Sequence, residues 1–137
     1  MIKNCMLYMY FDGQCENALA LYQSVFGLKI HEKISYGEAE PDTDKVTANM
    51  IMNSTSSLGG MTICACDLPG KALIKGDRSA CWLEIDSEES FHTIYDSLVG
   101  NGSAALTVPE TTFWNSLYAK IQDPYGFIWE LNCQTDA

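Results

Sequence analysis

The sequence has little positive charge. Eight lysines and arginines stand against eighteen aspartates and glutamates, which leaves a formal net charge of -10 over 137 residues. A protein with this balance repels the phosphates of nucleic acids and the headgroups of anionic lipids. We therefore expect neither a nucleic acid nor a membrane surface among its partners.

Long apolar runs are also missing. The longest ones, such as residues 5–11, are far shorter than the roughly 20 residues that a membrane-spanning helix needs. The N-terminus has no basic segment followed by a long apolar one, as a secretion signal would have. We expect a cytoplasmic protein.

The apolar content is that of a globular chain. Hydrophobic residues make up 47% of the sequence and charged residues 19%, unlike the composition of a disordered protein. A chain of this length can bury its own core without covalent cross-links. The six cysteines, which contain no C-x-x-C pair, are therefore expected to be free thiols.

The first part of the chain predicts a strand and a helix. Residues 4–11 form an apolar run rich in aromatics, and Asp12-Gly13 ends it with turn chemistry and a candidate helix N-cap. The helix that follows ends at Gly27 in the C′ position. Its apolar stripe has helical spacing and consists of Ala18, Leu21, Tyr22 and Val25.

The same order returns 73 residues later, which is the interval from Gly27 to Gly100. Residues 80–85 predict a strand, Asp86 with Glu89 resembles a capping box, and a second helix ends at Gly100. Its stripe matches the first helix in register and consists of Phe91, Ile94, Tyr95 and Leu98. The repeat indicates that a supersecondary unit was duplicated within one domain.

Three further strands are predicted after each helix, at about residues 28–36, 46–53, 61–66, 104–108, 117–122 and 127–133. The acidic residues 37–45 are expected to form an exposed loop. The expected organisation is a single domain over residues 1–137, with module 1 at about 1–66, a linker at 67–78 and module 2 at about 79–135.

Two motifs stand at opposite ends of the chain. Tyr10-Phe11-Asp12-Gly13 precedes a helix that ends in L-Y-Q-S-V-F-G, and Phe113-Trp114 and Tyr118 precede D-P-Y-G-F-I-W-E-L-N at residues 123–132. Together they resemble the PhnB-like branch of the glyoxalase/bleomycin-resistance/extradiol dioxygenase superfamily, also called vicinal-oxygen-chelate proteins. Leu21 stands where this branch usually has Phe.

The resemblance implies an α+β fold and a set of partners. In that fold two β-α-β-β-β modules form a strongly curved mixed sheet, with the helices on its convex face and a concave small-molecule pocket inside. Homodimers are common in the superfamily. We therefore expect a small-molecule ligand and a second copy of the chain as partners.

Metal-dependent members of the superfamily bind a divalent ion with His, Gln or Glu from the first and fourth strands of each module. The resemblance gives this chain one such residue, Glu130; the other positions fall at Leu7 or Tyr8, Ala80 or Cys81, and Ile63 or Cys64. One carboxylate does not hold a catalytic cation without further ligands. We therefore predict no metal and no other cofactor, and we disfavour glyoxalase I and dioxygenase chemistry.

A zinc site is the alternative to this prediction. It would use the thiolates of Cys64 and Cys81 beside Glu130 and Tyr8, a soft ligand set that suits zinc. Its competing interpretation is that both cysteines are buried structural thiols.

Glu130 is the candidate catalytic residue, because a carboxyl group in an apolar pocket can serve as a general acid or base. The alternative is a carboxylate that accepts a hydrogen bond from Tyr8, Tyr10, Tyr118 or water. The candidate pocket residues are aromatic side chains and two cysteines, namely Tyr8, Tyr10, Cys64, Cys81, Trp114 and Tyr118. For Trp82 and Trp129 we expect core packing.

Three functions stay open at this point. The first is a small-molecule enzyme, metal-independent or with an atypical site, that uses Glu130 as acid or base. The second is a non-catalytic protein that binds cationic aromatic drugs, as bleomycin-resistance relatives do, with the acidity of the chain attracting them. A structural or partner-binding role without a ligand is a third.

PhnB-like relatives also carry the labels of a 3-demethylubiquinone methyltransferase and a DNA-binding protein, but no glycine-rich nucleotide-binding turn is visible and the charge opposes DNA.

Overall fold

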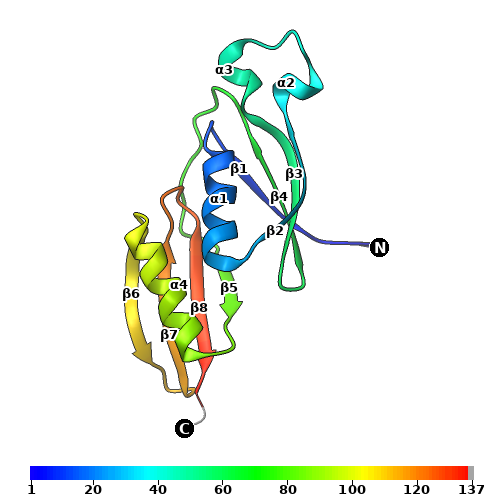
Figure 1. Cartoon of the computed structure of the whole chain (residues 1–137). Coiled ribbons are helices and arrows are strands. Elements are labelled where there is room, and N and C mark those ends of the chain that lie inside the picture. Colours follow the sequence, from blue (N-terminus) through cyan, green and yellow to red (C-terminus); the bar gives the residue numbers. More distant parts are fainter. Residues whose placement is uncertain (136–137) are drawn as a thin grey trace. The chain divides into compact units, whose positions relative to one another are not determined.

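The computed structural model describes residues 1–135, which fall into two compact units (Figure 1). Module 1 covers Met1–Leu73, and module 2 begins at Ile74. The boundary lies inside the predicted linker at residues 67–78. Whether the two modules act as a single domain stays a prediction. Within residues 1–135, no helix is long and apolar enough to cross a membrane.

Module 1 is a four-stranded mixed sheet with one long helix. Its elements are β1 (Leu7–Phe11), α1 (Cys15–Phe26), β2 (Lys29–Ser35), α2 (Tyr36–Ala39), α3 (Lys45–Ala48), β3 (Ile51–Leu58) and β4 (Met61–Asp67). The strand order is β1-β4-β3-β2. β1 runs parallel to β4, and the other neighbours are antiparallel.

Module 2 repeats this topology. Its elements are β5 (Cys81–Glu84), α4 (Glu88–Gly100), β6 (Ala104–Thr111), β7 (Ser116–Gln122) and β8 (Ile128–Gln134). The strand order is β5-β8-β7-β6, with β5 parallel to β8 and the other pairs antiparallel. The predicted α+β class and the two β-α-β-β-β modules are therefore confirmed.

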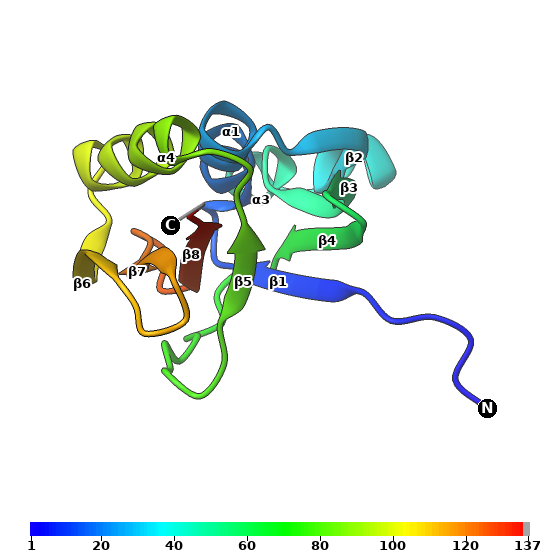
Figure 2. The ribbon, with the colours of Figure 1, turned by 90° about the horizontal axis from the view of Figure 1, so that it is seen from below.

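Each long helix covers one face of its own sheet (Figure 2). In module 2 the helix buries Phe91 and Leu98 completely. Trp129 and Leu131 of β8 are also buried and pair with Ile121 and Ala119 of β7. Side chains alternate between the faces of a strand, so the neighbours of Trp129 and Leu131 point to the other face. The predicted core position of Trp129 is thus confirmed.

Several predicted boundaries are wrong. Residues 46–53 do not form one strand, because Asp44 caps α3 by accepting a hydrogen bond from the Thr47 amide at 2.9 Å. The strand begins only at Ile51. The acidic loop at residues 37–45 likewise contains a helical turn, α2, which has a complete Ser35–Glu38 capping box.

The C-terminal glycine of α1 is confirmed, but its predicted N-cap at Asp12-Gly13 is wrong, because the N-cap position is Gln14, whose side chain makes no capping hydrogen bond. Both ends of α4 are shifted from the prediction. Gly27 ends α1 with a left-handed φ of 75°. The N-cap of α4 is Ser87 rather than Asp86, because the Ser87 side chain accepts from the Ser90 amide at 3.1 Å. Gly100 is still helical, and the positive φ of 93° falls at Gly102. All six cysteines are free thiols, as predicted.

Candidate functional site

Glu130 lies in the middle of β8, on the face of the module 2 sheet opposite α4. It pairs with Trp82 on β5 and with Lys120 on β7. Paired residues project to the same face of a sheet. We call this surface the Glu130 face; the register assigns to it Trp82, Glu84, Tyr118, Lys120, Gln122, Ile128, Glu130 and Asn132.

Tyr118 holds the Glu130 carboxylate in place. The phenol Oη donates a hydrogen bond to Glu130 Oε1 at 2.6 Å. Burial, the hydrogen bond to Glu130 and the charge of that residue together raise the pKa of Tyr118 to about 12. The phenol therefore stays protonated at neutral pH and acts as a donor. This contact is one of the alternatives that the sequence left open for Glu130.

Two tryptophans flank this pair. The Tyr118 ring centroid lies 5.8 Å from that of Trp82 and 6.0 Å from that of Trp114. Trp82 is 45% exposed and Trp114 is 43% exposed. The expectation that Trp82 packs in the core is therefore wrong, since its register with Glu130 turns it away from α4.

A second carboxylate, Glu84, lies beside this cluster on β5. The indole Nε1 of Trp82 donates a hydrogen bond to Glu84 Oε1 at 2.6 Å. The amide Nδ2 of Asn132 also donates to the Glu84 carboxylate, at 3.2 Å from Oε1 and 3.3 Å from Oε2. Trp114 Nε1 in turn donates to Asn132 Oδ1 at 3.3 Å. Asn132 is only 3% exposed. A continuous chain of hydrogen bonds thus fixes both tryptophans on the Glu130 face.

The sequence did not single out Glu84 or Asn132. Strand alternation alone puts Asn132 on the same face as Glu130. The neighbourhood of Glu84 depends on the parallel register of β5 with β8, which pairs Glu84 with Asn132. No local pattern in the sequence encodes that register.

The structure brings together only some of the predicted site residues. Trp114 and Tyr118 lie with Glu130, as described above. Cys81 pairs with Trp129, so it lies on the α4 side of the sheet, away from Glu130. Burial raises the pKa of its thiol. Cys81 is therefore removed from the candidate site by its register.

Tyr8, Tyr10 and Cys64 belong to module 1. The rings of Tyr8 and Tyr10 stack with centroids 5.0 Å apart, and Tyr8 pairs with Cys64 across the β1–β4 ladder. Tyr8 Oη donates to Asn53 Oδ1 at 3.4 Å. Burial, followed by the neighbouring Cys66, raises the pKa of Tyr8 to about 12. These residues form an aromatic and thiol surface on the face of the module 1 sheet opposite buried Met9 and Ala65.

The residues around Glu130 do not fit a divalent metal ion. The first-strand residue that pairs with Glu130 is Trp82, whose indole offers no ligand. The nearest polar groups, the Tyr118 hydroxyl and the Asn132 amide, are used as donors to the two carboxylates. Among residues 1–135, no group of three or more His, Cys, Asp or Glu could hold a metal ion.

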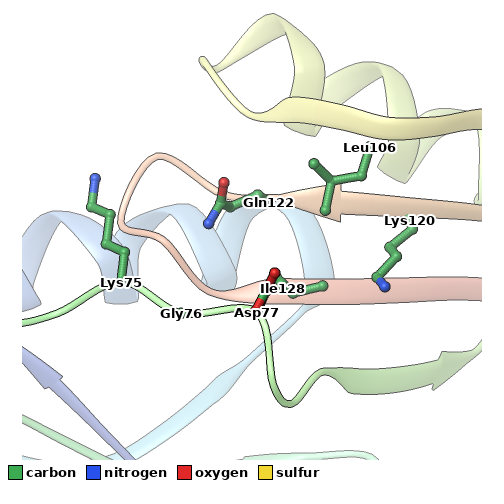
Figure 3. Close-up of a pocket in the computed structure, with 7 residues that line it drawn as sticks. All are labelled: Lys75, Gly76, Asp77, Leu106, Lys120, Gln122 and Ile128. Atoms are coloured by element: carbon green, nitrogen blue, oxygen red, sulfur yellow. The ribbon is translucent and has the colours of Figure 1, made fainter.

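A pocket of about 550 Å³ opens further along the Glu130 face (Figure 3). It lies between the start of module 2 and strands β6, β7 and β8. Its lining residues are Lys75, Gly76, Asp77, Leu106, Lys120, Gln122 and Ile128. None of the predicted pocket residues line it. Lys120 connects the two regions, because it pairs with Glu130 in the β7–β8 ladder.

The sequence is similar to a known family. The model of the Glyoxalase/Bleomycin resistance protein/Dioxygenase superfamily matches residues 6–131. Protein YjdN of Escherichia coli (strain K12) is 28% identical in an alignment of 137 positions that covers 91% of each chain. The match spans both modules.

Solved structures share the fold. Protein PA1353 from Pseudomonas aeruginosa matches with a TM-score of 0.80 and 20% identity, over 97% of this chain and 100% of its own. A protein from Bacillus cereus described as a PhnB protein and putative 3-demethylubiquinone-9 3-methyltransferase matches with a TM-score of 0.76 and 19% identity, over 96% and 99%. The resemblance to PhnB-like proteins that the two sequence motifs carry is therefore confirmed.

Proposed function

Because this chain belongs to the glyoxalase/bleomycin resistance protein/dioxygenase superfamily, we propose that it binds a small organic molecule on the Glu130 face of module 2 and that Glu130 serves there as a general acid or base. The observation that carries this proposal is the 2.6 Å hydrogen bond from Tyr118 to Glu130, placed between the rings of Trp82 and Trp114.

Tyr118 leaves one carboxylate oxygen of Glu130 for the ligand. Only Oε1 accepts a hydrogen bond from the described residues, so Oε2 retains its acceptor sites. An oxygen that is held in place and close to a bound molecule can take a proton from it or return one. The half-exposed indole rings supply flat apolar surfaces for the rest of the ligand. The proposed chemistry is therefore proton transfer without a metal ion.

Non-catalytic binding of cationic aromatic molecules is the second candidate. Glu84 and Glu130 place two carboxylates on the same face as Trp82, Trp114 and Tyr118. Aromatic faces and carboxylates together attract an organic cation, and the attraction increases when water is excluded. The net charge of -10 would favour the approach of such a ligand at low salt.

Two further expectations belong to this proposal. A homodimer follows from what is common in the superfamily, and a cytoplasmic location follows from the composition of the sequence. The mass of the protein in solution and the fraction of the cell in which it is found test them directly.

Replacing Glu130 separates the two functions. A panel of neutral, anionic and cationic aromatic compounds is first screened by ligand-observed NMR, and each bound compound is then followed for conversion by mass spectrometry. Glu130→Gln keeps the shape of the side chain and removes its basicity. We expect this variant to retain neutral ligands but to lose about a hundredfold or more in turnover, the usual range for a general base.

The control is Asp96→Asn, which removes one negative charge from an exposed position of α4. It should convert ligands at the rate of the unmodified protein. Equal turnover in Glu130→Gln and the unmodified protein would refute the role of Glu130. Tight binding of cationic aromatics that weakens with salt, without any conversion, would favour the second candidate.

A further inference from the structure

The pocket shown in Figure 3 concentrates positive charge in an acidic protein. The sequence contains only eight lysines and arginines against eighteen acidic residues. Two of those eight, Lys75 and Lys120, line this one pocket, and Asp77 is its single acidic residue. The local charge of the pocket is therefore opposite in sign to that of the whole chain.

Lys120 is not neutralised by the carboxylate across from it. It pairs with Glu130 in the β7–β8 register, which would permit an ion pair on the shared face. Glu130 instead accepts the Tyr118 hydroxyl. Within residues 1–135 the ion pair that forms is Lys33–Glu16, in module 1. Figure 3 shows the ammonium end of Lys120 pointing toward Ile128, so its charge is available inside the pocket.

Lys75 is positioned by the β7–β8 turn. A Cβ atom placed on Gly126 would lie 2.6 Å from Lys75 Cγ and 2.8 Å from Lys75 Cδ, so the lysine stem lies directly on the glycine backbone. Gly126 also has a φ of 96°, which side-chain-bearing residues rarely adopt. Gln122 Nε2 donates to the Gly126 carbonyl at 3.3 Å and fixes the same turn. The turn therefore fixes the Lys75 stem at the edge of the pocket, while in Figure 3 its ammonium end points away from the other lining residues.

Two apolar side chains also line the pocket. Leu106 and Ile128 face the same space as the two lysines, and Ile128 is only 6% exposed. A ligand that fills this pocket thus meets the Lys120 ammonium, the Asp77 carboxylate, the Gln122 amide and an apolar surface, with Lys75 at the edge. Ammonium groups bind carboxylate and phosphoryl oxygens through charge-assisted hydrogen bonds.

We propose that this pocket binds the oxyanion group of a small organic molecule, a carboxylate or a phosphoryl group, with Lys120 as the main contact and Lys75 as the second. The organic part lies over Leu106 and Ile128. This inference rests on the proposed function in one respect: Lys120 adjoins Glu130, so the anion would belong to the molecule on which Glu130 acts.

The test titrates the full chain with inorganic phosphate and, separately, with acetate, and follows backbone amides by two-dimensional NMR. We expect shifts at the residues that line the pocket. Lys120→Gln should weaken binding about tenfold, the effect of losing one charged hydrogen bond of about 1.4 kcal/mol, and Lys75→Gln should weaken it less. Stronger binding of phosphate than of acetate would identify the phosphoryl group as the anion, and the reverse order would identify the carboxylate.

Two variants make the result specific. Lys29→Gln removes the same charge from an exposed position of β2 in module 1 and should leave the affinity unchanged. Asp77→Asn removes the single carboxylate of the pocket and should strengthen binding. No binding of either anion, or an equal loss in Lys29→Gln and Lys120→Gln, would overturn the proposal. Glu130→Gln should retain anion binding while losing turnover. The anion pocket and the acid-base role of Glu130 can therefore be refuted independently of each other.

Discussion

Tyr118 is a residue whose protonation should affect folding at high pH. Its pKa is raised from 10.0 to about 12 in the folded protein. Below pH 10 both states keep the phenol proton, and the stabilisation is complete. Between pH 10 and 12 the unfolded chain loses this proton while the folded protein retains it, so the free energy of unfolding falls as pH rises.

Subtracting the titration of Tyr118→Phe from that of the unmodified protein isolates this residue. We expect the ultraviolet difference signal of tyrosinate to appear near pH 12, and urea unfolding of Tyr118→Phe to depend less on pH between 10 and 12. A difference signal centred at pH 10 would show that Glu130 and burial do not hold the proton.

At the scale of the element, the turn between β7 and β8 is fixed by Asp123. Its Oδ1 accepts from the amides of Tyr125 and Phe127 at 2.9 and 3.0 Å, and its Oδ2 accepts from Trp129 Nε1 at 2.9 Å. Asp123 is 4% exposed. One buried carboxylate thus connects the turn that supports Lys75 with the core tryptophan of β8.

Asp123→Ala should lower the free energy of unfolding by about 2–3 kcal/mol, because it leaves buried donors without an acceptor. Chemical denaturation measures this change. Asp96→Ala, at an exposed position of α4, should stay within about 0.5 kcal/mol of the unmodified protein. Equal losses in the two variants would mean that the Asp123 contacts contribute nothing specific.

Element type could be predicted from the sequence wherever apolar periodicity was clear. The stripes of α1 and α4 and the apolar run of β8 are such cases. The sequence does not predict the position of β3, because its central residues, Asn53 to Ser57, are polar, although Ser54 and Ser56 are fully buried. Ser54 satisfies its hydroxyl by donating to the Ala65 carbonyl at 2.7 Å. Polar residues that are buried in this way give no hydrophobic signal.

The candidate site was predictable only along single strands. Alternation on β8 was enough to separate Glu130 from Trp129. The exposure of Trp82, the position of Cys81 and the role of Glu84 all depend on the pairing of β5 with β8. The sequence indicates for Lys75 only a place in the linker, because its contact with Gly126 joins segments that are distant in the sequence.

At the scale of the whole molecule, several large apolar side chains are exposed. Ile74 is 96% exposed, Phe113 is 93% exposed and Val108, on the edge strand β6, is 64% exposed. Exposed apolar groups and free strand edges favour association with another chain. These features support the proposed homodimer.

Light scattering during size-exclusion chromatography measures the mass directly. We expect twice the 15.2 kDa of one chain, at moderate salt where repulsion between the acidic copies is screened. A single-chain mass at every protein concentration used would contradict the homodimer.

Because the three tryptophans differ in exposure, the intrinsic fluorescence of the protein should report on ligand binding. Trp82 and Trp114 flank Tyr118 and are half exposed, whereas Trp129 is buried beneath α4. A molecule that settles on the Glu130 face covers the first two indoles and leaves the third in constant surroundings. Binding should therefore quench part of the tryptophan fluorescence and shift its emission to shorter wavelength, without any label on the protein or the ligand.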